Sequence, residues 1–430
     1  MTSETCHIGV LGAARIAMKN CRAVSHPSTS CSIVAIASRS EQKGQDFVNE
    51  IFTKDGKSAP LVIGGENAYL DLLSTNGKES APKIDAVYIP LPTKLHETYV
   101  ARALSSGHHV LLEKPVAESS ESYRKMLKTA SENGKLLMDG TMFVHHPRTK
   151  EFVNSIPNPN RVHFNFTFDG GEDFLKNDIR IKKDGDFMGC IGDVGWYCVR
   201  MALLIFSGLN AKALKGLVTG AQVVRHQLNE EGVPIDTDCM VYFTDVSVGD
   251  QYNFEQLINM FFYNGNQIIL TIFSKTICYF NSFQNRVLSF HCSFLHPLNQ
   301  TVQISGSGQE YSAILTDPIL PHKGDTISFK LVKQDLIQYD AICTNETKLV
   351  ECDNNLVQEV RMWGNFAKWT RKIEESVDAA KDVENEVWWG GDSEEVKEAN
   401  AIASYSLHTQ IVLDALMESI RLSGAKVQVK

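Results

Sequence analysis

The chain has 430 residues, of which 43% are hydrophobic and 22% are charged, as is typical of a soluble globular protein. This length predicts two or three domains with a sizeable core. The formal net charge of −9 argues against a nucleic-acid-binding protein, because such proteins need clustered positive charge and the sequence has no dense basic run.

No targeting or membrane segment is predicted. Residues 1–7 are short and polar, and the longest apolar runs, such as 201–206, are far too short to span a bilayer. The ten cysteines are scattered without a CxxC pair, so we expect reduced, mostly buried thiols and no metal site. These features predict a cytoplasmic protein.

The first 25 residues predict a strand (7–11), a turn of small residues and a helix, which together begin a dinucleotide-binding unit. In such a unit the backbone N–H groups of the turn and the helix N-terminus face a pyrophosphate. Alanine occupies the position of the second glycine in the GxGxxG pattern, where the backbone must approach the cofactor closely. The residues that we expect at the cofactor are Gly12, Ala13, Ala14, Arg15 and Ile16.

The end of the second predicted strand, 32–37, favours NADP over NAD. An NAD site usually places an acid here to bind the ribose 2′-hydroxyl, but Ser38 and Arg39 follow this strand. Arg39 can pair with a 2′-phosphate and stack on adenine. Alternatively, Arg39 is a solvated residue at a helix start, and NAD remains possible. Residues 53–65 look like a surface insertion, followed by a short apolar helix face at 69–73.

The next strand, 84–89, ends in a proline-rich turn. Ligands of open α/β sheets bind at the carboxyl ends of the strands, so we expect Leu91, Pro92 and Thr93 beside the cofactor. His96 begins the helix that follows, where it has either a structural role or a position close to the nicotinamide.

Strand 109–113 delivers Glu113 and Lys114 to the same edge of the sheet. A partly desolvated lysine near a cationic cofactor ring can have a lowered pKa and exchange protons near neutrality. The alternative is a surface turn with a solvated Lys114. A helix at 120–133 and a strand at 135–139 complete the predicted doubly wound sheet.

After residue 139 the pattern changes to strands with one polar face, which predicts a largely antiparallel sheet. We therefore expect an α/β protein with a Rossmann domain, 1–142, and an α+β domain with a large open sheet, 143–430. Residues 245–284 extend this sheet as an insertion or form a partner-binding flap. The further predicted strands are 162–168, 214–219, 239–243, 267–273, 287–294 and 300–305, and the predicted helices are 357–375 and 401–422, the latter ended by Gly424.

An acidic stretch, 374–398, lies between the two predicted helices and is expected to be solvated. Trp388 and Trp389 interrupt it. They either pin this loop to the body of the protein or contact a neighbouring subunit.

These motifs together resemble the Gfo/Idh/MocA oxidoreductase family, especially its branch of NADP-dependent D-xylose dehydrogenases and dimeric dihydrodiol dehydrogenases. The resemblance is clear over 7–240 and thinner beyond. The stretches that carry it are 12–17, 90–96, 113–115, 139–142, 146–149, 173–180 and 192–197.

The resemblance implies roles for single residues. Lys114 would lie beside the nicotinamide and the reacting group, with a cis bond to Pro115, and Tyr197 would complete a proton-transfer pair that Asp193 orients. Phe143, Asp178 and Arg180 would contact the substrate. Of the family's three glycines before the aspartate, only Gly189 is present, with Phe187 and Met188 at the other positions, which affects the shape of the pocket.

A lysine–tyrosine pair suits hydride transfer, because an adjacent ammonium would stabilise a phenolate and lower the tyrosine pKa. The resemblance thus implies NADP-dependent hydride transfer to or from a CH–OH group of a sugar, polyol or dihydrodiol. It also implies a carbohydrate-like small-molecule substrate and a homodimer through the C-terminal sheet. The alternatives are a non-catalytic dinucleotide-binding regulator and a redox-neutral, NAD-dependent glycosidase.

Overall fold

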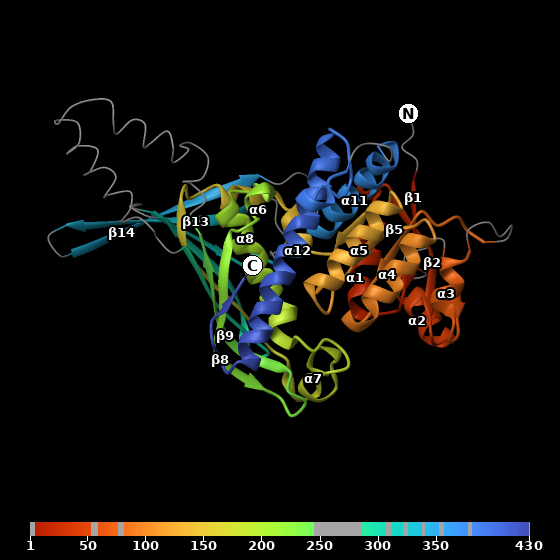
Figure 1. Cartoon of the computed structure of the whole chain (residues 1–430), viewed down its shortest axis with the longest axis horizontal. Coiled ribbons are helices and arrows are strands. Elements are labelled where there is room, and N and C mark those ends of the chain that lie inside the picture. The colour runs from red at the N-terminus through yellow and green to blue at the C-terminus, as the bar shows by residue number, and fades with distance from the viewer. Residues whose placement is uncertain are drawn as a thin grey trace.

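The computed structural model describes residues 5–52, 59–75, 81–244, 286–306, 311–320, 326–337, 340–351, 357–376 and 381–429. Over this part of the chain the strands form two sheets, one of six strands and one of nine. Figure 1 shows the two sheets side by side, with the long C-terminal helix α12 (Glu394–Arg421) between them. The predicted α/β class with a second, strand-rich part is confirmed.

The N-terminal sheet is parallel throughout, and its order β3-β2-β1-β4-β5-β6 is that of a dinucleotide-binding fold. β4 and β5 are buried along their whole length, which explains their continuous apolar sequences. The strands are β1 (Cys6–Leu11), β2 (Cys31–Ser38), β3 (Leu61–Gly64), β4 (Ala86–Ile89), β5 (His109–Leu112) and β6 (Leu137–Asp139). The helices are α1 (Arg15–Val24), α2 (Glu41–Ile51), α3 (Ala68–Leu73), α4 (His96–Ser105) and α5 (Ser120–Glu132).

The surface insertion predicted at 53–65 is wrong for its second half, because Leu61–Gly64 is the edge strand β3 and pairs with β2. This strand has only four residues and lies half-buried at the edge of the sheet, so its sequence carries little periodicity. The prediction for 53–58 lies outside the described residues.

The second sheet has the order β14-β13-β12-β11-β7-β10-β9-β8-β15 and is antiparallel except for the pair of β7 and β10. Along β7, Phe164 and Phe166 are buried while Asn165 between them is partly exposed, which is the predicted alternation. The strands are β7 (Pro159–Asp169), β8 (Val218–Leu228), β9 (Pro234–Phe243), β10 (Arg286–Ser293), β11 (Leu295–Gly306), β12 (Tyr311–Thr316), β13 (Thr326–Ile337), β14 (Asp340–Glu351) and β15 (Val427–Gln428).

Parts of this sheet differ from the prediction. The strand expected at 214–219 begins only at Val218 and continues to Leu228, through a polar and exposed second half that shows no apolar alternation. β12, β13 and β14 were not predicted. The predicted strand 267–273 and the insertion 245–284 lie outside the described residues.

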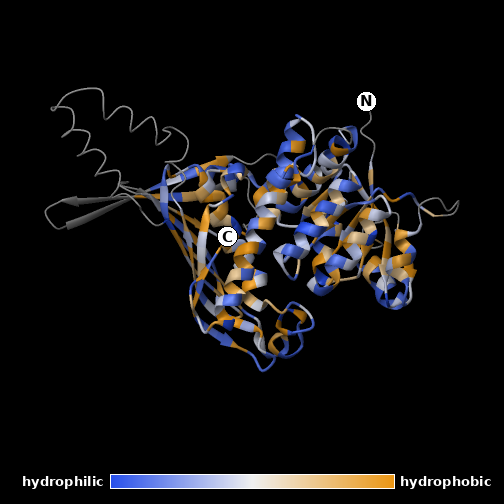
Figure 2. Ribbon diagram, viewed as in Figure 1, coloured by the Kyte–Doolittle hydropathy of each residue, from blue (hydrophilic) through white to orange (hydrophobic). Residues whose placement is uncertain are grey.

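One helix fills the space between the second sheet and α12. All residues of α8 (Trp196–Ser207) are buried, because β7 and β10 cover one side of this helix and α12 covers another. A π-helical turn, Ile191–Gly195, leads directly into α8. Figure 2 shows apolar residues recurring along both sheets and along the helices that cover them. Two short helices, α6 (Pro147–Val153) and α7 (Gly171–Asn177), flank β7 in the sequence.

The C-terminal helices return to the Rossmann unit. From α11 (Gln358–Glu375), the Trp363 indole donates to Asn20 Oδ1 of α1 at 2.9 Å, and Glu359 pairs with Lys19 at 2.5 Å. α12 contacts α5 and β6 on one side and α8 and β8 on the other. It begins seven residues earlier than predicted, because Ser393 caps it and acidic residues in its first turn complement the helix dipole.

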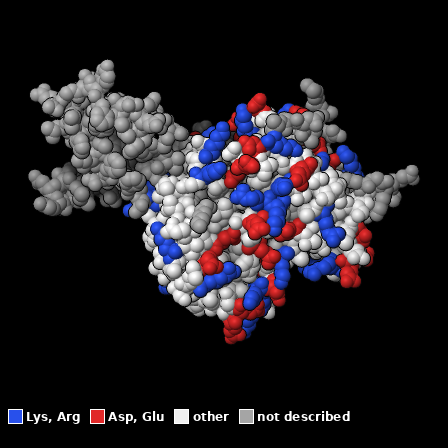
Figure 3. Space-filling view, in the orientation of Figure 1, with Lys and Arg blue, Asp and Glu red and all other residues white. Residues whose placement is uncertain are grey.

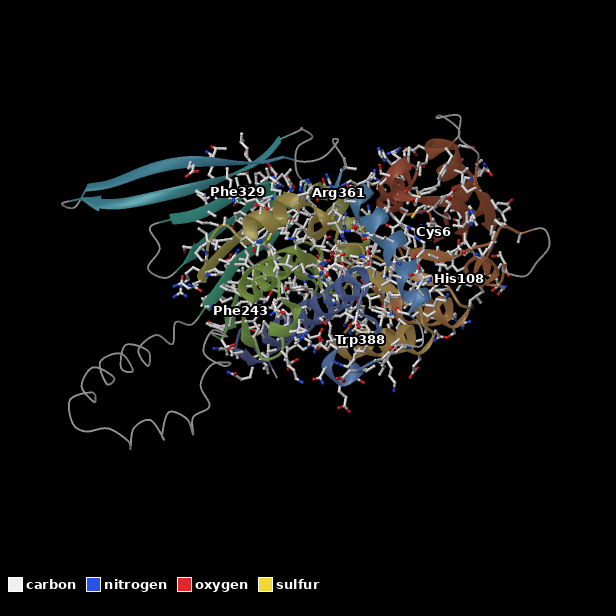
Figure 4. The ribbon with its side chains drawn as sticks, turned by 90° about the horizontal axis from the view of Figure 1, so that it is seen from above. Cys6, His108, Phe243, Phe329, Arg361 and Trp388 are labelled. Carbon is white, nitrogen blue, oxygen red and sulfur yellow. The ribbon has the colours of Figure 1, made fainter. Side chains whose placement is uncertain are left out.

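Trp388 and Trp389 are buried and fasten the preceding segment to the Rossmann unit, which confirms the first of the two predicted alternatives. Ser131 Oγ donates to the Trp388 carbonyl at 2.6 Å, and the Trp389 indole donates to the Lys135 carbonyl at 2.9 Å. Figure 4 places Trp388 at this junction, with Phe243 and Phe329 marking the distant second sheet.

Positive and negative side chains are interspersed over the face shown in Figure 3. This face therefore presents no broad basic surface for a polyanion. No helix in the described ranges is both long enough and apolar enough to cross a membrane.

Candidate active site

Lys114 lies where β5 leaves the sheet, at the edge where ligands of this fold bind. Its side chain is 13% exposed and donates to the Asp193 carboxylate, whose side chain is 8% exposed. Lys114 Nζ also donates to the Asp193 carbonyl at 3.3 Å. The bond from Lys114 to Pro115 is cis, as the resemblance implied.

The π-helical turn brings Asp193 to Lys114, and two glycines make this close approach possible. A side chain on Gly192 would come 2.7 Å from Met188 Cβ and 3.4 Å from Pro115 Cγ. Gly189, with φ of +52°, has the Pro234 carbonyl oxygen only 2.0 Å from the position of a Cβ. The one glycine kept from the family pattern is therefore required by backbone geometry.

Arg180 extends the network on the other side of Asp193. Its guanidinium donates to Asp193 Oδ2 at 3.1 Å and to both carboxylate oxygens of Asp178, at 2.9 and 3.1 Å. The guanidinium also lies 4.6 Å from the centre of the Phe174 ring. The predicted residues Lys114, Asp193, Arg180 and Asp178 thus form a line of alternating charges.

Tyr197 follows Asp193 by one helical turn and faces the same site. Lys114 Nζ lies 5.1 Å from the centre of its ring, and the hydroxyl contacts Met142 Sδ at 3.8 Å. Phe143 packs edge-on against this ring, with centroids 6.0 Å apart, and is fully buried. Phe143 therefore presents no surface to a substrate in this structure and acts on the site through Tyr197.

The protonation state of the site differs from the prediction. Burial alone would lower the pKa of Lys114, but the negative charge of Asp193 outweighs it and raises this pKa above its usual value. Burial raises the pKa of Tyr197, and the opposing effect of Lys114 does not cancel this rise. Neither pKa shows the expected lowering, because Asp193 outweighs burial at Lys114 and burial outweighs the charge of Lys114 at Tyr197.

The turn after β1 fits a pyrophosphate. Gly12 has φ of +108°, and a Cβ on it would lie 3.1 Å from the Leu91 side chain. Ala14 at the N-cap of α1 accepts no hydrogen bond through its side chain, so this cap leaves the first N–H groups of the helix for a ligand. Ala13 is half-buried beside it, while Arg15 and Ile16 are exposed on the first turn of α1.

Arg39 is exposed at the end of β2, next to the buried Ser38. Its positive charge lies near Tyr69 of α3, whose hydroxyl is 3.7 Å from the Cβ position of Gly12. Burial raises the pKa of Tyr69, and Arg39 opposes this rise. Sequence reasoning missed Tyr69, because a hydroxyl within an apolar helix face was the only signal.

Two other predicted cofactor residues, Thr93 and His96, have their polar groups occupied by the protein. Thr93 donates through its hydroxyl and its N–H to Asp186 Oδ1, at 2.6 and 3.0 Å. Both ring nitrogens of His96 face carbonyl oxygens, of Leu91 at 2.8 Å and of Val116 at 3.2 Å. These contacts favour the structural alternative for His96, which holds the turn containing Leu91 and Pro92.

Glu113 turns away from the edge of the sheet. Its Oε1 accepts from the Tyr88 hydroxyl at 2.5 Å and from Asn20 Nδ2 at 3.3 Å, beneath α1. Burial raises the pKa of Glu113 despite these donors. Glu113 therefore has a structural role, in which it joins β5 to Tyr88 of β4 and Asn20 of α1.

Comparison with known proteins agrees with this geometry. Residues 6–141 match a family model described as an oxidoreductase family with an NAD-binding Rossmann fold. The chain is 32% identical over 209 residues to a dTDP-3,4-didehydro-2,6-dideoxy-alpha-D-glucose 3-reductase of Streptomyces violaceoruber, which covers 47% of this chain and 55% of that protein. It is also 32% identical over 208 residues to D-xylose 1-dehydrogenase (NADP(+)) 2 of Haloferax volcanii, covering 46% and 56%. These alignments span about half the length of the relatives.

Solved structures resemble nearly the whole chain. The 3-ketoreductase KijD10 from Actinomadura kijaniata, in complex with NADP and TDP-benzene, has a TM-score of 0.64 at 20% identity and covers 96% of this chain and 98% of its own. The aldose-aldose oxidoreductase from Caulobacter crescentus, complexed with glycerol, has a TM-score of 0.64 at 14% identity, with 99% of both chains covered. At these identities the likeness shows the fold.

Proposed function

We propose that the protein is an NADP(H)-dependent oxidoreductase of sugar-like substrates in the Gfo/Idh/MocA family, whose model matches residues 6–141. The reaction transfers a hydride between the cofactor and a carbon of a CH–OH or carbonyl group. The observation that carries the proposal is the pair of Lys114 and Asp193 beside Tyr197 at the carboxyl end of β5. A protein that only sensed the cofactor would not need these buried proton-transfer groups.

The chain's own residues fit the cofactor. Gly12 has a positive φ and packs closely against Leu91, and the Ala14 side chain does not cap α1, so the turn between β1 and α1 suits a pyrophosphate bound by backbone N–H groups. At the end of β2, the exposed Arg39 supplies a positive charge for a 2′-phosphate, and it lies near Tyr69, whose hydroxyl is close to the turn. When bound, the nicotinamide supplies or accepts the hydride.

Lys114 and Tyr197 supply the proton. Because Asp193 keeps Lys114 charged and burial keeps Tyr197 neutral, both groups hold their proton at neutral pH. In carbonyl reduction such a pair donates a proton to the substrate oxygen on which negative charge develops. Arg180 and Asp178 continue the charged network on the other side of Asp193. The protonated state therefore favours reduction of a sugar carbonyl near neutrality, whereas alcohol oxidation becomes faster as the pH rises.

The cofactor preference is tested by titrating the protein with NADPH and NADH and following nicotinamide fluorescence. We expect Arg39→Ala to weaken NADPH binding by about 10-fold or more, the value of a lost charge-assisted hydrogen bond, while NADH binding changes little. Arg22→Ala, on the exposed side of α1, is the control. Equal losses for both cofactors would contradict a role of Arg39 at the 2′-phosphate.

The catalytic role is tested by turnover of the same cofactor with aldoses, ketoses, polyols and sugar nucleotides. We expect Lys114→Ala to lower kcat by about 10²–10⁴-fold, as for loss of a general acid, while NADPH affinity stays near the wild-type value. Lys176→Ala, which removes only an exposed ion pair with Glu172, is the matched control. Near-normal turnover in Lys114→Ala would remove Lys114 from the chemistry.

We also propose a cytoplasmic homodimer that forms through the outer face of the nine-stranded sheet. The seven cysteines whose side chains the structure describes are free thiols, which suits a reducing compartment. At the start of β11, Leu298 is 63% exposed on this outer face, where an apolar side chain suits an interface, and the hollow that it lines with His291 and His296 would then face the partner subunit. Sedimentation should give twice the mass of one chain, and the mass of one chain would contradict the dimer.

A further inference from the structure

Three side chains from three strands converge on the outer face of the nine-stranded sheet, away from the active site. They are Asp236 of β9, His291 of β10 and His296 at the start of β11. His291 Nε2 lies 2.7 Å from Asp236 Oδ1, His296 Nε2 lies 3.8 Å from the same oxygen, and all three ligand atoms lie within 4.8 Å of one another.

Strand alternation separates this cluster from the catalytic residues. Phe290 and Cys292 point to the inner face of β10, where their side chains lie within 3.4 Å of the Cβ position of Gly195 in the π-helical turn. His291 between them therefore points outward, where it lines a shallow hollow with Asn165, Thr167 and His296.

A β-bulge brings His296 to the cluster. Where β11 pairs with β7, the register shifts between Leu295 and Asn299, so the residues between them project from the ladder. Thr167 Oγ1 donates to the Pro297 carbonyl at 2.6 Å and fixes this bulge. The position of His296 is thus set by the fold of the strand and not by a free loop.

The charges around Asp236 suit a cation. Asp236 is 3% exposed, and its Oδ2 accepts from Arg225 at 2.6 Å, which leaves Oδ1 directed at the two imidazoles. Arg225 also pairs with Asp238 at 2.6 Å, so one positive charge is shared by two carboxylates. The group keeps a net negative charge with both histidines neutral, and Arg225 fixes the orientation of the ligand carboxylate.

We propose that Asp236, His291 and His296 form a site for a divalent transition-metal ion of the zinc type. Two imidazoles and one carboxylate are a usual ligand set for Zn²⁺ and leave a fourth position for water. Ligand atoms around tetrahedral Zn²⁺ lie about 3.4 Å apart. This value lies between the distances of His291 Nε2 and His296 Nε2 from Asp236 Oδ1, 2.7 and 3.8 Å. On binding, the proton of His291 Nε2 moves to Nδ1, and the freed lone pair replaces the hydrogen bond to Asp236 with a bond to the metal.

The test is a Zn²⁺ titration of untagged, chelator-treated full-length protein in competition with a chromophoric chelator. We expect one Zn²⁺ per chain in this site, and about 10-fold or more weaker binding in both His291→Ala and His296→Ala. His163→Ala is the matched control. His163 lies on β7, on the same outer face of the sheet as the cluster, but it contacts Ser289 and Asn165. Binding that is equal in the wild type and both variants would overturn the site.

Two further measurements distinguish a lost site from a damaged fold. Co²⁺ should give the visible absorption of a four- or five-coordinate site with the wild type and with His163→Ala, but not with His296→Ala. Zn²⁺ should raise the Tm of the wild type and of His163→Ala but not of His291→Ala or His296→Ala, while NADPH binds equally to all of these variants. A Tm increase of the same size in His296→Ala would contradict the proposal.

Discussion

Asp193 lies between two cations, Lys114 and Arg180, and this position controls the proton-transfer groups. Burial raises the pKa of Asp193 less than these two charges lower it, so the carboxylate stays ionised. Burial would lower the pKa of Lys114, but Asp193 raises it above its ordinary value. Loss of this one carboxylate should therefore change the pH dependence of the reaction and not only its rate.

We expect the reduction activity of the wild type to be constant near neutrality and to fall only at strongly alkaline pH, where Lys114 or Tyr197 loses its proton. In Asp193→Asn, burial acts on Lys114 without compensation, so the alkaline decline should move to lower pH by about one unit or more. The measurement is kcat/KM against pH. Asp173→Asn, on the exposed surface of α7, should keep the wild-type profile. An unchanged profile in Asp193→Asn would show that Asp193 does not set the pKa of the proton donor.

Sequence motifs identified most of these residues, but their electrostatics could not be predicted. Lys114, Asp193, Arg180 and Tyr197 were all expected at the site, and the structure brings them together. Which carboxylate would neutralise Lys114 depends on the π-helical turn, and a sequence pattern does not specify a π turn. The metal cluster was missed for a related reason, because Asp236, His291 and His296 have no ligand spacing in sequence and meet only through strand register and a bulge.

At the scale of elements, the loop that contains Asp184 and Asp186, before α8, binds the turn between β4 and α4 of the Rossmann unit. Asp186 accepts two hydrogen bonds from Thr93, and its neighbour Asp184 pairs with Lys94 at 2.9 Å. Asp186 thus satisfies a backbone N–H in the turn between β4 and α4, where Leu91 approaches Gly12. Asp184, in contrast, is 94% exposed, and such an ion pair contributes little.

We expect Asp186→Ala to weaken NADPH binding by about 5- to 100-fold, because an N–H and a hydroxyl lose a charged acceptor and the turn loosens. Asp184→Ala should bind NADPH within about twofold of the wild type. Asp186→Asn, which keeps one acceptor oxygen, should recover part of the affinity. Equal affinities of the two alanine variants would show that Asp186 does not order the turn.

Helices and strands were predicted correctly where their burial produces a clear hydrophobic periodicity in the sequence. The five buried strands of the Rossmann sheet other than β3, and α11, were placed within about three residues, which is the usual uncertainty of helix and strand ends. β3 and the polar half of β8 were not, because edge positions need no apolar alternation. The early start of α12 could have been found from Ser393, a capping residue before two acids, but the acidic stretch suggested a solvated loop.

At the scale of the whole molecule, Arg200 joins three parts of the chain that are far apart in sequence. This fully buried residue of α8 donates to Asp139 at the end of β6, at 3.3 Å, and to Ser406 and Thr409 of α12, both at 2.9 Å. Ser406 also donates to Asp139. Burial would raise the pKa of Asp139, but Arg200 and Ser406 lower it, so Asp139 is ionised at the junction of the two sheets. The predicted domain boundary at residue 142 stays a prediction. The contact between Arg200 and Asp139 joins the segments before and after that residue.

We expect Arg200→Ala to lower the free energy of unfolding by about 3–5 kcal/mol, because it leaves the Asp139 carboxylate buried without a counter-charge. Adding Asp139→Asn should restore part of this loss, since the double variant no longer buries an unpaired charge. The pKa of Asp139 is lower in the folded state, so the pair stabilises the wild type above the unfolded pKa, and this contribution is lost as the pH falls through the folded value. Urea unfolding at neutral and acidic pH measures both effects, with Arg421→Ala, which removes only an exposed ion pair with Glu418 on α12, as the control. A loss below about 1 kcal/mol in Arg200→Ala, or no recovery in the double variant, would show that the pair of Arg200 and Asp139 does not hold the two sheets together.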